Sequence, residues 1–196
     1  MYLFLLILFV FSPLSLWLVI TVRKHHASVL TALIGLLSGF VSLALAAFIP
    51  VFPAGGFFVP AAVEEAVKFL VLFTVMYHAV SDRNLASLPW LGLGAALAFG
   101  TAENAGYVLF SVDGGFFLAF ARMFSSLVLH SACGILAGAA VCRLRSRTGT
   151  FILPFIGAVA LHTFYNGMVL FGPWGLSAAL ASAVIAVLLL GKNFLK

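Results

Sequence analysis

Seven apolar stretches, each about as long as a membrane-spanning helix, make up most of this chain. They cover approximately residues 2–22, 28–49, 60–80, 88–110, 116–141, 150–171 and 174–191. A helix needs about 20 apolar residues to cross about 30 Å of hydrocarbon. The pattern therefore predicts an all-α integral membrane protein, a polytopic bundle of about seven transmembrane helices. We interpret residues 1–196 as a single transmembrane domain.

The composition excludes a soluble fold. The chain is 64% hydrophobic and only 8% charged, whereas soluble domains are about 45–50% apolar and about 25% charged. No soluble core could absorb this much apolar surface, so the lipid bilayer must be part of the solvent. The net charge of +5 does not indicate a nucleic-acid partner, because the basic residues stand in short loops between apolar stretches.

The basic residues predict an orientation in the cell membrane. With seven spans, eight of the ten Lys and Arg residues fall on one side of the bilayer. They are Arg23, Lys24, Arg83, Arg143, Arg145, Arg147, Lys192 and Lys196. By the positive-inside rule we expect the N-terminus outside and the C-terminus in the cytoplasm. The two cysteines, Cys133 and Cys142, lie within or at the end of one span and are nine residues apart, which argues against a mutual disulfide.

A small set of ionisable residues remains inside the spans. A charge at the middle of a membrane helix costs roughly 2.5 to 3.5 kcal/mol on insertion scales, so such residues normally mark a site or a pathway. The set consists of Glu64, Glu65, Lys68, Glu103, Arg122, His130 and His162. Its members belong to the third to sixth spans, which predicts a four-helix core around a polar, water-containing chamber. Interhelical hydrogen bonds that only pin the bundle are the alternative.

Spacing places some of these residues on shared helix faces. Glu64 and Lys68 are four positions apart and can pair. Glu65 points about 100° away from Glu64, from which we expect that one lysine cannot neutralise both carboxylates. His162 and Asn166 are also four positions apart, so a polar face is expected in the sixth span as well.

Helical rise gives a rough depth for the remaining members. Glu103 and His162 each precede the next predicted outer loop by ten residues, or ~15 Å, so the two could meet near the midplane. His130 follows the loop by 15 residues, or ~22 Å. On this estimate His130 lies too deep to join the others unless its span is tilted or starts later.

The same residues carry a resemblance to a known family. EEAVK (64–68) resembles the EExxK signature of the PrsW family of integral membrane proteases, and FGTAEN (99–104) is similar to its second motif. HSACG (130–134) and HTFYN (162–166) resemble the later histidine motifs. The four motifs occur in the expected order over about residues 60–170. In the related CAAX protease and Abi superfamily, CAAX-type members carry a histidine where this chain has Glu103.

The resemblance implies a membrane endopeptidase that cleaves membrane-anchored proteins within the bilayer or near its outer side. Family members are implicated in the first cleavage of anti-sigma factors, so a substrate of that kind is an expectation. A noncatalytic scaffold is the main alternative, because the superfamily includes the scaffold subunit of γ-secretase. A proton-coupled transporter is a third reading, since Glu/His chains relay protons. We see no internal repeat that favours it.

Amide hydrolysis needs an activated water, a stabilised oxyanion and a proton donor for the leaving amine. Either Glu64 or Glu65 can act as the general base. His162 can hold the water or the oxyanion, and Asn166 can donate a hydrogen bond to the oxyanion. The predicted catalytic residues are Glu64, Glu65, Glu103, His130, His162 and Asn166.

A metal ion is a further hypothesis for this set. The available oxygen and nitrogen ligands are Glu64, Glu103, His130 and His162, and such a set suits zinc. The H-E-x-x-H signature of soluble zinc proteases is absent. A zinc-dependent and a metal-free glutamate mechanism therefore both stay open.

Overall fold

The computed structural model describes residues 11–21, 29–49, 56–79, 85, 87–110, 115–147 and 150–194. Within these ranges the chain forms seven α-helices. They are Phe11–Thr21, α2 (Val29–Ala47), α3 (Phe58–Ala79), α4 (Leu88–Phe110), α5 (Gly115–Ser146), α6 (Ile152–Val169) and α7 (Gly172–Phe194). Each helix falls within or closely overlaps one of the seven apolar stretches, so the prediction of an all-helical membrane bundle is confirmed. The Arg122 side chain and Asp113 lie outside the described residues.

Four segments are long and apolar enough to cross a membrane. They are Val29–Ala47, Phe124–Ser146, Ile152–Val169 and Gly172–Leu190. The helices α3 and α4 differ from these because α3 contains EEAVK and α4 contains the polar pair Glu103 and Asn104. Charged groups at membrane depth are tolerated where protein surrounds them. The chain is accordingly a multi-pass membrane protein in which the polar residues turn inward.

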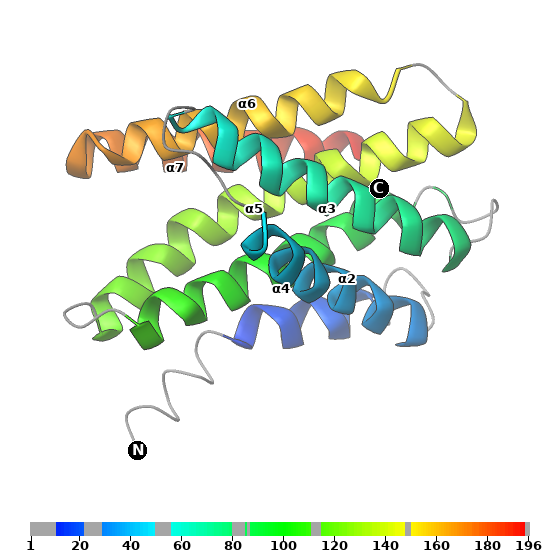
Figure 1. Cartoon of the computed structure of the whole chain (residues 1–196), viewed down its shortest axis with the longest axis horizontal. Helices are drawn as coiled ribbons and strands as arrows, with labels where there is room; N and C mark the ends of the chain where they lie inside the picture. Colours follow the sequence, from blue (N-terminus) through cyan, green and yellow to red (C-terminus); the bar gives the residue numbers. More distant parts are fainter. Residues whose placement is uncertain are drawn as a thin grey trace.

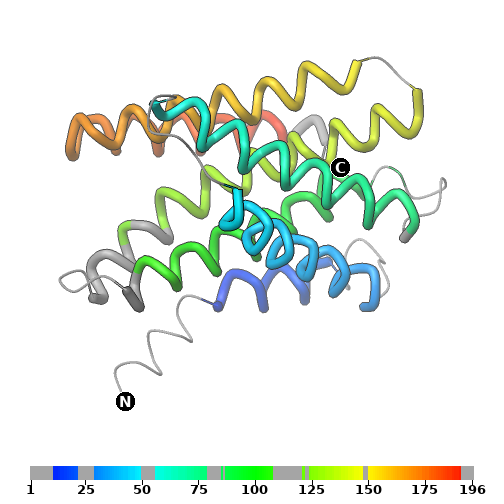
Figure 2. The backbone as a smooth tube through the Cα atoms, viewed as in Figure 1, coloured from blue at the N-terminus to red at the C-terminus, as the bar shows by residue number. Residues whose placement is uncertain are grey.

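The helices run side by side along the long axis of the molecule (Figure 1). The longest helix, α5, has 32 residues and contacts α3, α4, α6 and α7. On one side α2 packs against α3 and α4, and on the other α6 packs against α3 and α7. The chain path in Figure 2 shows α4 and α5 as an antiparallel pair. Because α5 contacts each of the other motif-bearing helices, it can bring their polar residues together.

Glycine residues allow the closest helix contacts. A side-chain carbon added at Gly92 of α4 would collide with the carbonyl oxygen of Gly134 of α5. One added at Gly39 of α2 would collide with the carbonyl oxygen of Ala95 in the same way. Small residues at such points let two membrane helices approach closely. They hold α4 tightly between α2 and α5, which leaves little freedom in the position of its polar residues.

Candidate active site

Glu65 and Lys68 form a buried ion pair on α3. Their side chains are 1% and 6% exposed. Lys68 Nζ lies 2.8 Å from Glu65 Oε1 and 3.7 Å from Glu64 Oε2. Lys68 therefore contacts both carboxylates and not only Glu64 on its predicted face, although its single positive charge balances one of the two negative charges. Side chains three and four positions before a residue both reach its face of the helix, so a long lysine can contact the two of them.

Two histidines contact this ion pair through their Nδ1 atoms. Lys68 Nζ donates to Nδ1 of His130 on α5 at 3.1 Å, and Nδ1 of His162 on α6 donates to Glu65 Oε1 at 2.7 Å. An ammonium group can only donate and a carboxylate can only accept. His130 therefore accepts at Nδ1 and carries its hydrogen at Nε2, whereas His162 carries a hydrogen at Nδ1. Toward the ion pair, the Nδ1 atom of His130 is therefore an acceptor and the Nδ1 atom of His162 is a donor.

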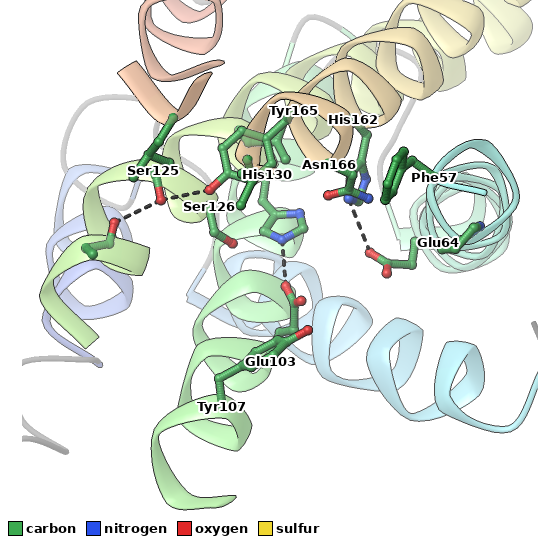
Figure 3. Close-up of a pocket in the computed structure, with 15 residues that line it drawn as sticks. Phe57, Glu64, Glu103, Tyr107, Ser125, Ser126, His130, His162, Tyr165 and Asn166 are labelled. Atoms are coloured by element: carbon green, nitrogen blue, oxygen red, sulfur yellow. Dashed lines mark hydrogen bonds and ion pairs between the residues drawn. The ribbon is translucent and has the colours of Figure 1, made fainter. Parts of the chain in front are cut away.

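The Nε2 atoms of both rings face two other carboxylates. His130 Nε2 donates to Glu103 Oε2 at 2.8 Å, and His162 Nε2 lies 3.8 Å from Glu64 Oε2 (Figure 3). The Glu64 side chain is 25% exposed, and its Oε2 has no hydrogen-bond partner among the described residues. An enclosed carboxylate oxygen without a partner is costly. This oxygen is itself buried, with Lys68 Nζ at 3.7 Å and His162 Nε2 at 3.8 Å.

The contact between His130 and Glu103 corrects the depth estimate for His130. The ring of His130 lies against Gly100, where an added side-chain carbon would be 2.6 Å from the ring, and Glu103 follows Gly100 by about one turn. Side chains on an α-helix lean toward its N-terminus. Because α4 and α5 are antiparallel, Glu103 and His130 lean toward each other. A depth estimate from the helical rise of the backbone does not include the direction in which the side chains lean.

A cavity of about 460 Å³ lies against these groups. A volume of this size is within the usual range for ligand sites. Its polar lining comprises Glu64, Glu103, Tyr107, Ser125, Ser126, His130, His162, Tyr165 and Asn166. Of the six predicted catalytic residues, all but Glu65 line this cavity, and Glu65 is hydrogen-bonded to the cavity residue His162.

The structure adds polar residues that sequence reasoning did not single out for the site. Tyr165 donates from its hydroxyl to Ser125 Oγ at 2.7 Å, and Ser125 donates to the carbonyl oxygen of Ala121 at 2.8 Å (Figure 3). Tyr165 stands inside the HTFYN motif, beside Asn166. The adjacent pair Ser125 and Ser126 interrupts an apolar span. The position of Tyr165 in the motif and the serine pair were the sequence signals for these residues. Neither signal indicates by itself which face of its helix lines the cavity.

Glu65, His130 and His162 also form a group suited to a metal ion. One donor atom from each residue lies within 4.8 Å of the others, and all three residues are buried. Two imidazoles and one carboxylate match the donors of known catalytic zinc sites. Both histidines were among the metal ligands predicted from the sequence. The carboxylate of this group is Glu65, whereas the predicted carboxylate ligands were Glu64 and Glu103. Because the Lys68 ammonium contacts Glu65 and His130, a metal ion at this group would require Lys68 to move away.

Comparison with known proteins agrees with the motif pattern and the fold. The model of a family described as "PrsW family intramembrane metalloprotease" matches residues 13–191. Searches among curated proteins and among solved structures find no match. The family match extends from the helix Phe11–Thr21 into α7 and includes all four motif-bearing segments. This chain belongs to the PrsW family of intramembrane proteases.

Proposed function

We propose that this protein hydrolyses a peptide bond of a membrane-anchored protein substrate, with Glu64 as the general base. One observation carries the proposal: Glu64, His162 and Asn166 line the same cavity, whereas Glu65 does not. A base, a ring nitrogen and an amide donor at one cavity are groups that amide hydrolysis can use. Glu65 is enclosed with Lys68, which favours Glu64 for the chemical role.

The proposed reaction moves one proton through Glu64. Glu64 takes a proton from a water molecule as the water oxygen bonds to the peptide carbonyl carbon. The Asn166 amide donates to the oxygen that becomes negatively charged. Glu64 then passes the proton to the leaving nitrogen as the C–N bond breaks. Loss of a general acid–base group of this kind typically costs 10²- to 10⁴-fold in rate.

The buried ion pair serves as a positioning device in this scheme. Glu65 accepts from His162 Nδ1, which turns the other nitrogen of that ring toward Glu64. Lys68 and Glu103 hold His130 from its two sides. In a metal-dependent form of the reaction, Glu65, His130 and His162 would hold zinc, which supplies polarisation of the peptide carbonyl and activation of water.

We propose that the cavity opens toward the outer side of the cell membrane. Tyr107 near the end of α4, Pro60 near the start of α3 and Leu176 near the start of α7 all line it. By the count of basic residues, these helix ends are on the outer side. An impermeant thiol reagent applied to intact cells should label Asp113→Cys but not Arg145→Cys. The reverse pattern would refute the orientation.

The proposed function is tested by a cleavage assay with purified protein in liposomes. The substrates are single-span reporters, including a membrane-anchored anti-sigma factor, and the metal content of the protein is measured in parallel. We expect one defined cut in a reporter. Loss of cleavage with a chelator, restored by zinc, would assign the metal-dependent form, and cleavage unaffected by chelator in metal-free protein would assign the glutamate form. Folded protein that binds a reporter without cutting it would favour a scaffold.

A further inference from the structure

A second cavity lies away from the candidate active site, at the C-terminal ends of α3 and α5. These two helix ends are at the same end of the bundle (Figure 1). The cavity measures about 610 Å³ and is lined by Phe73, Tyr77, Leu144, Arg145 and Arg147. None of these residues lines the candidate active site. The cavity lies where the candidate span Phe124–Ser146 ends, so from the length of that span we expect it at the depth of the lipid headgroups.

The guanidinium group of Arg145 is held in place at this cavity. Its Nη1 donates to the carbonyl oxygen of Met76 at 3.1 Å. Its Cζ lies 5.0 Å from the centre of the Tyr77 ring, within the range of a cation–π contact. A side chain held by two such contacts loses little conformational freedom when a ligand binds. Arg145 is therefore a preorganised positive group at the edge of the hydrocarbon.

Arg147 brings a second guanidinium to the same cavity. It follows directly after α5 and has a φ of 55°, in the left-handed region that residues with a side chain rarely adopt. A residue in this conformation commonly ends an α-helix, and here it sets the direction in which the chain leaves α5. The side chain of Arg147 is exposed but lines the cavity together with Arg145. The two positive groups line one partly open cavity.

We propose that this cavity binds an anionic phospholipid. Paired guanidinium groups suit a phosphate, because their planar forks match its oxygens. Phe73 and Leu144 supply an apolar wall for the first part of an acyl chain, and no carboxylate lines the cavity in the described part of the chain. Basic pockets between membrane helices at headgroup depth bind such lipids in other membrane proteins. Its volume falls within the usual range for ligand sites.

Lipid retention measured by native mass spectrometry tests this proposal. The purified protein is exchanged into detergent with equal amounts of phosphatidylglycerol and phosphatidylcholine. We expect one phosphatidylglycerol to be retained in preference. Arg145→Gln and Arg147→Gln should each weaken that retention by about tenfold, as the loss of a hydrogen bond to a charged group implies. Thermal unfolding is measured for each variant, and the exposed Arg147 gives a usable result if Arg145→Gln fails to fold.

Arg143→Gln is the matched control. It removes the same charge from the same segment, but Arg143 donates to the carbonyl oxygen of Thr150 at 3.5 Å and does not line the cavity. We expect retention within about twofold of the unmodified protein. An equal loss in all three variants would show diffuse attraction and overturn the proposal, as would no preference for phosphatidylglycerol. Displacement of the lipid by an equal concentration of inorganic phosphate would reassign the cavity to a free anion.

Discussion

Glu64 and Glu65 are neighbours in the sequence, yet they lie in different environments. Glu64 is 25% exposed and lines the cavity, although each of the two residues has one carboxylate oxygen without a hydrogen-bond partner among the described residues. Glu65 is 1% exposed and bonds to both Lys68 and His162. Successive residues on a helix point about 100° apart, so one carboxylate can meet water while the next is enclosed. The difference favours a chemical role for Glu64 and a structural role for Glu65.

The largest effect on stability is expected for Glu65→Gln. The change leaves the Lys68 ammonium buried with only the more distant Glu64 as a counter-charge. Breaking a buried ion pair on one side costs about 3–5 kcal/mol. Unfolding of the purified variant in detergent, followed by circular dichroism, measures this loss. Glu64→Gln is the matched control and should cost less than about 1 kcal/mol, since its contact with Lys68 is long and partly exposed. Equal stability of both variants would contradict the comparison.

A smaller effect is expected on zinc binding when Lys68 is replaced. Lys68→Met frees Glu65 and His130 from the ammonium and removes a positive charge from the donor group. We expect zinc to bind at least about tenfold more tightly, since the repulsion of a nearby charge is worth more than about 1.4 kcal/mol in a protein interior. Competition with a fluorescent chelator measures the affinity, with Lys192→Met as the charge control. Weaker binding by Lys68→Met than by the control would mean that Lys68 supports the metal site.

Much of the fold followed from the sequence because apolar length decides what a bilayer can hold. The described helices match the predicted spans. The prediction that motif residues of four spans converge agrees with the contacts that link Glu65, Glu103, His130 and His162. The partner choice of Lys68 could not be predicted, because positions three and four residues before it are both within reach. Ser125 was missed for a related reason: its contact with Tyr165 depends on how α5 and α6 are rotated against each other.

The depth of His130 shows a second limit of sequence reasoning. Counting residues from a loop gives the height of the backbone, but Glu103 and His130 meet because their side chains lean toward each other across α4 and α5. That lean extends the reach of long side chains between antiparallel helices. Depth estimates from rise alone are therefore least reliable for the residues that build a site.

The smallest expected effect is a change in the nitrogen-15 signals of His130 and His162, which report which ring nitrogen carries the hydrogen. This change does not alter the fold. Nitrogen-15 spectra of selectively labelled histidine should show His130 with hydrogen on Nε2 and His162 with hydrogen on Nδ1, as their partners require. In Lys68→Met, the signal of His130 should change, while that of His162 stays. His78, which is exposed near the end of α3, serves as an internal reference. An Nδ1-bound hydrogen on His130 in the unmodified protein would contradict the assignment.

The rate of reporter cleavage by Glu64→Gln, measured per mole of folded protein in liposomes, tests the central claim most directly. The variant should unfold at nearly the same temperature as the unmodified protein, because the contact of Glu64 with Lys68 is long and partly exposed. Its cleavage rate should fall by about 10²- to 10⁴-fold, because the group that takes the proton from water is lost. A Glu64→Gln protein that cuts at the unmodified rate would contradict the account, and the catalytic role would then have to be sought at another carboxylate.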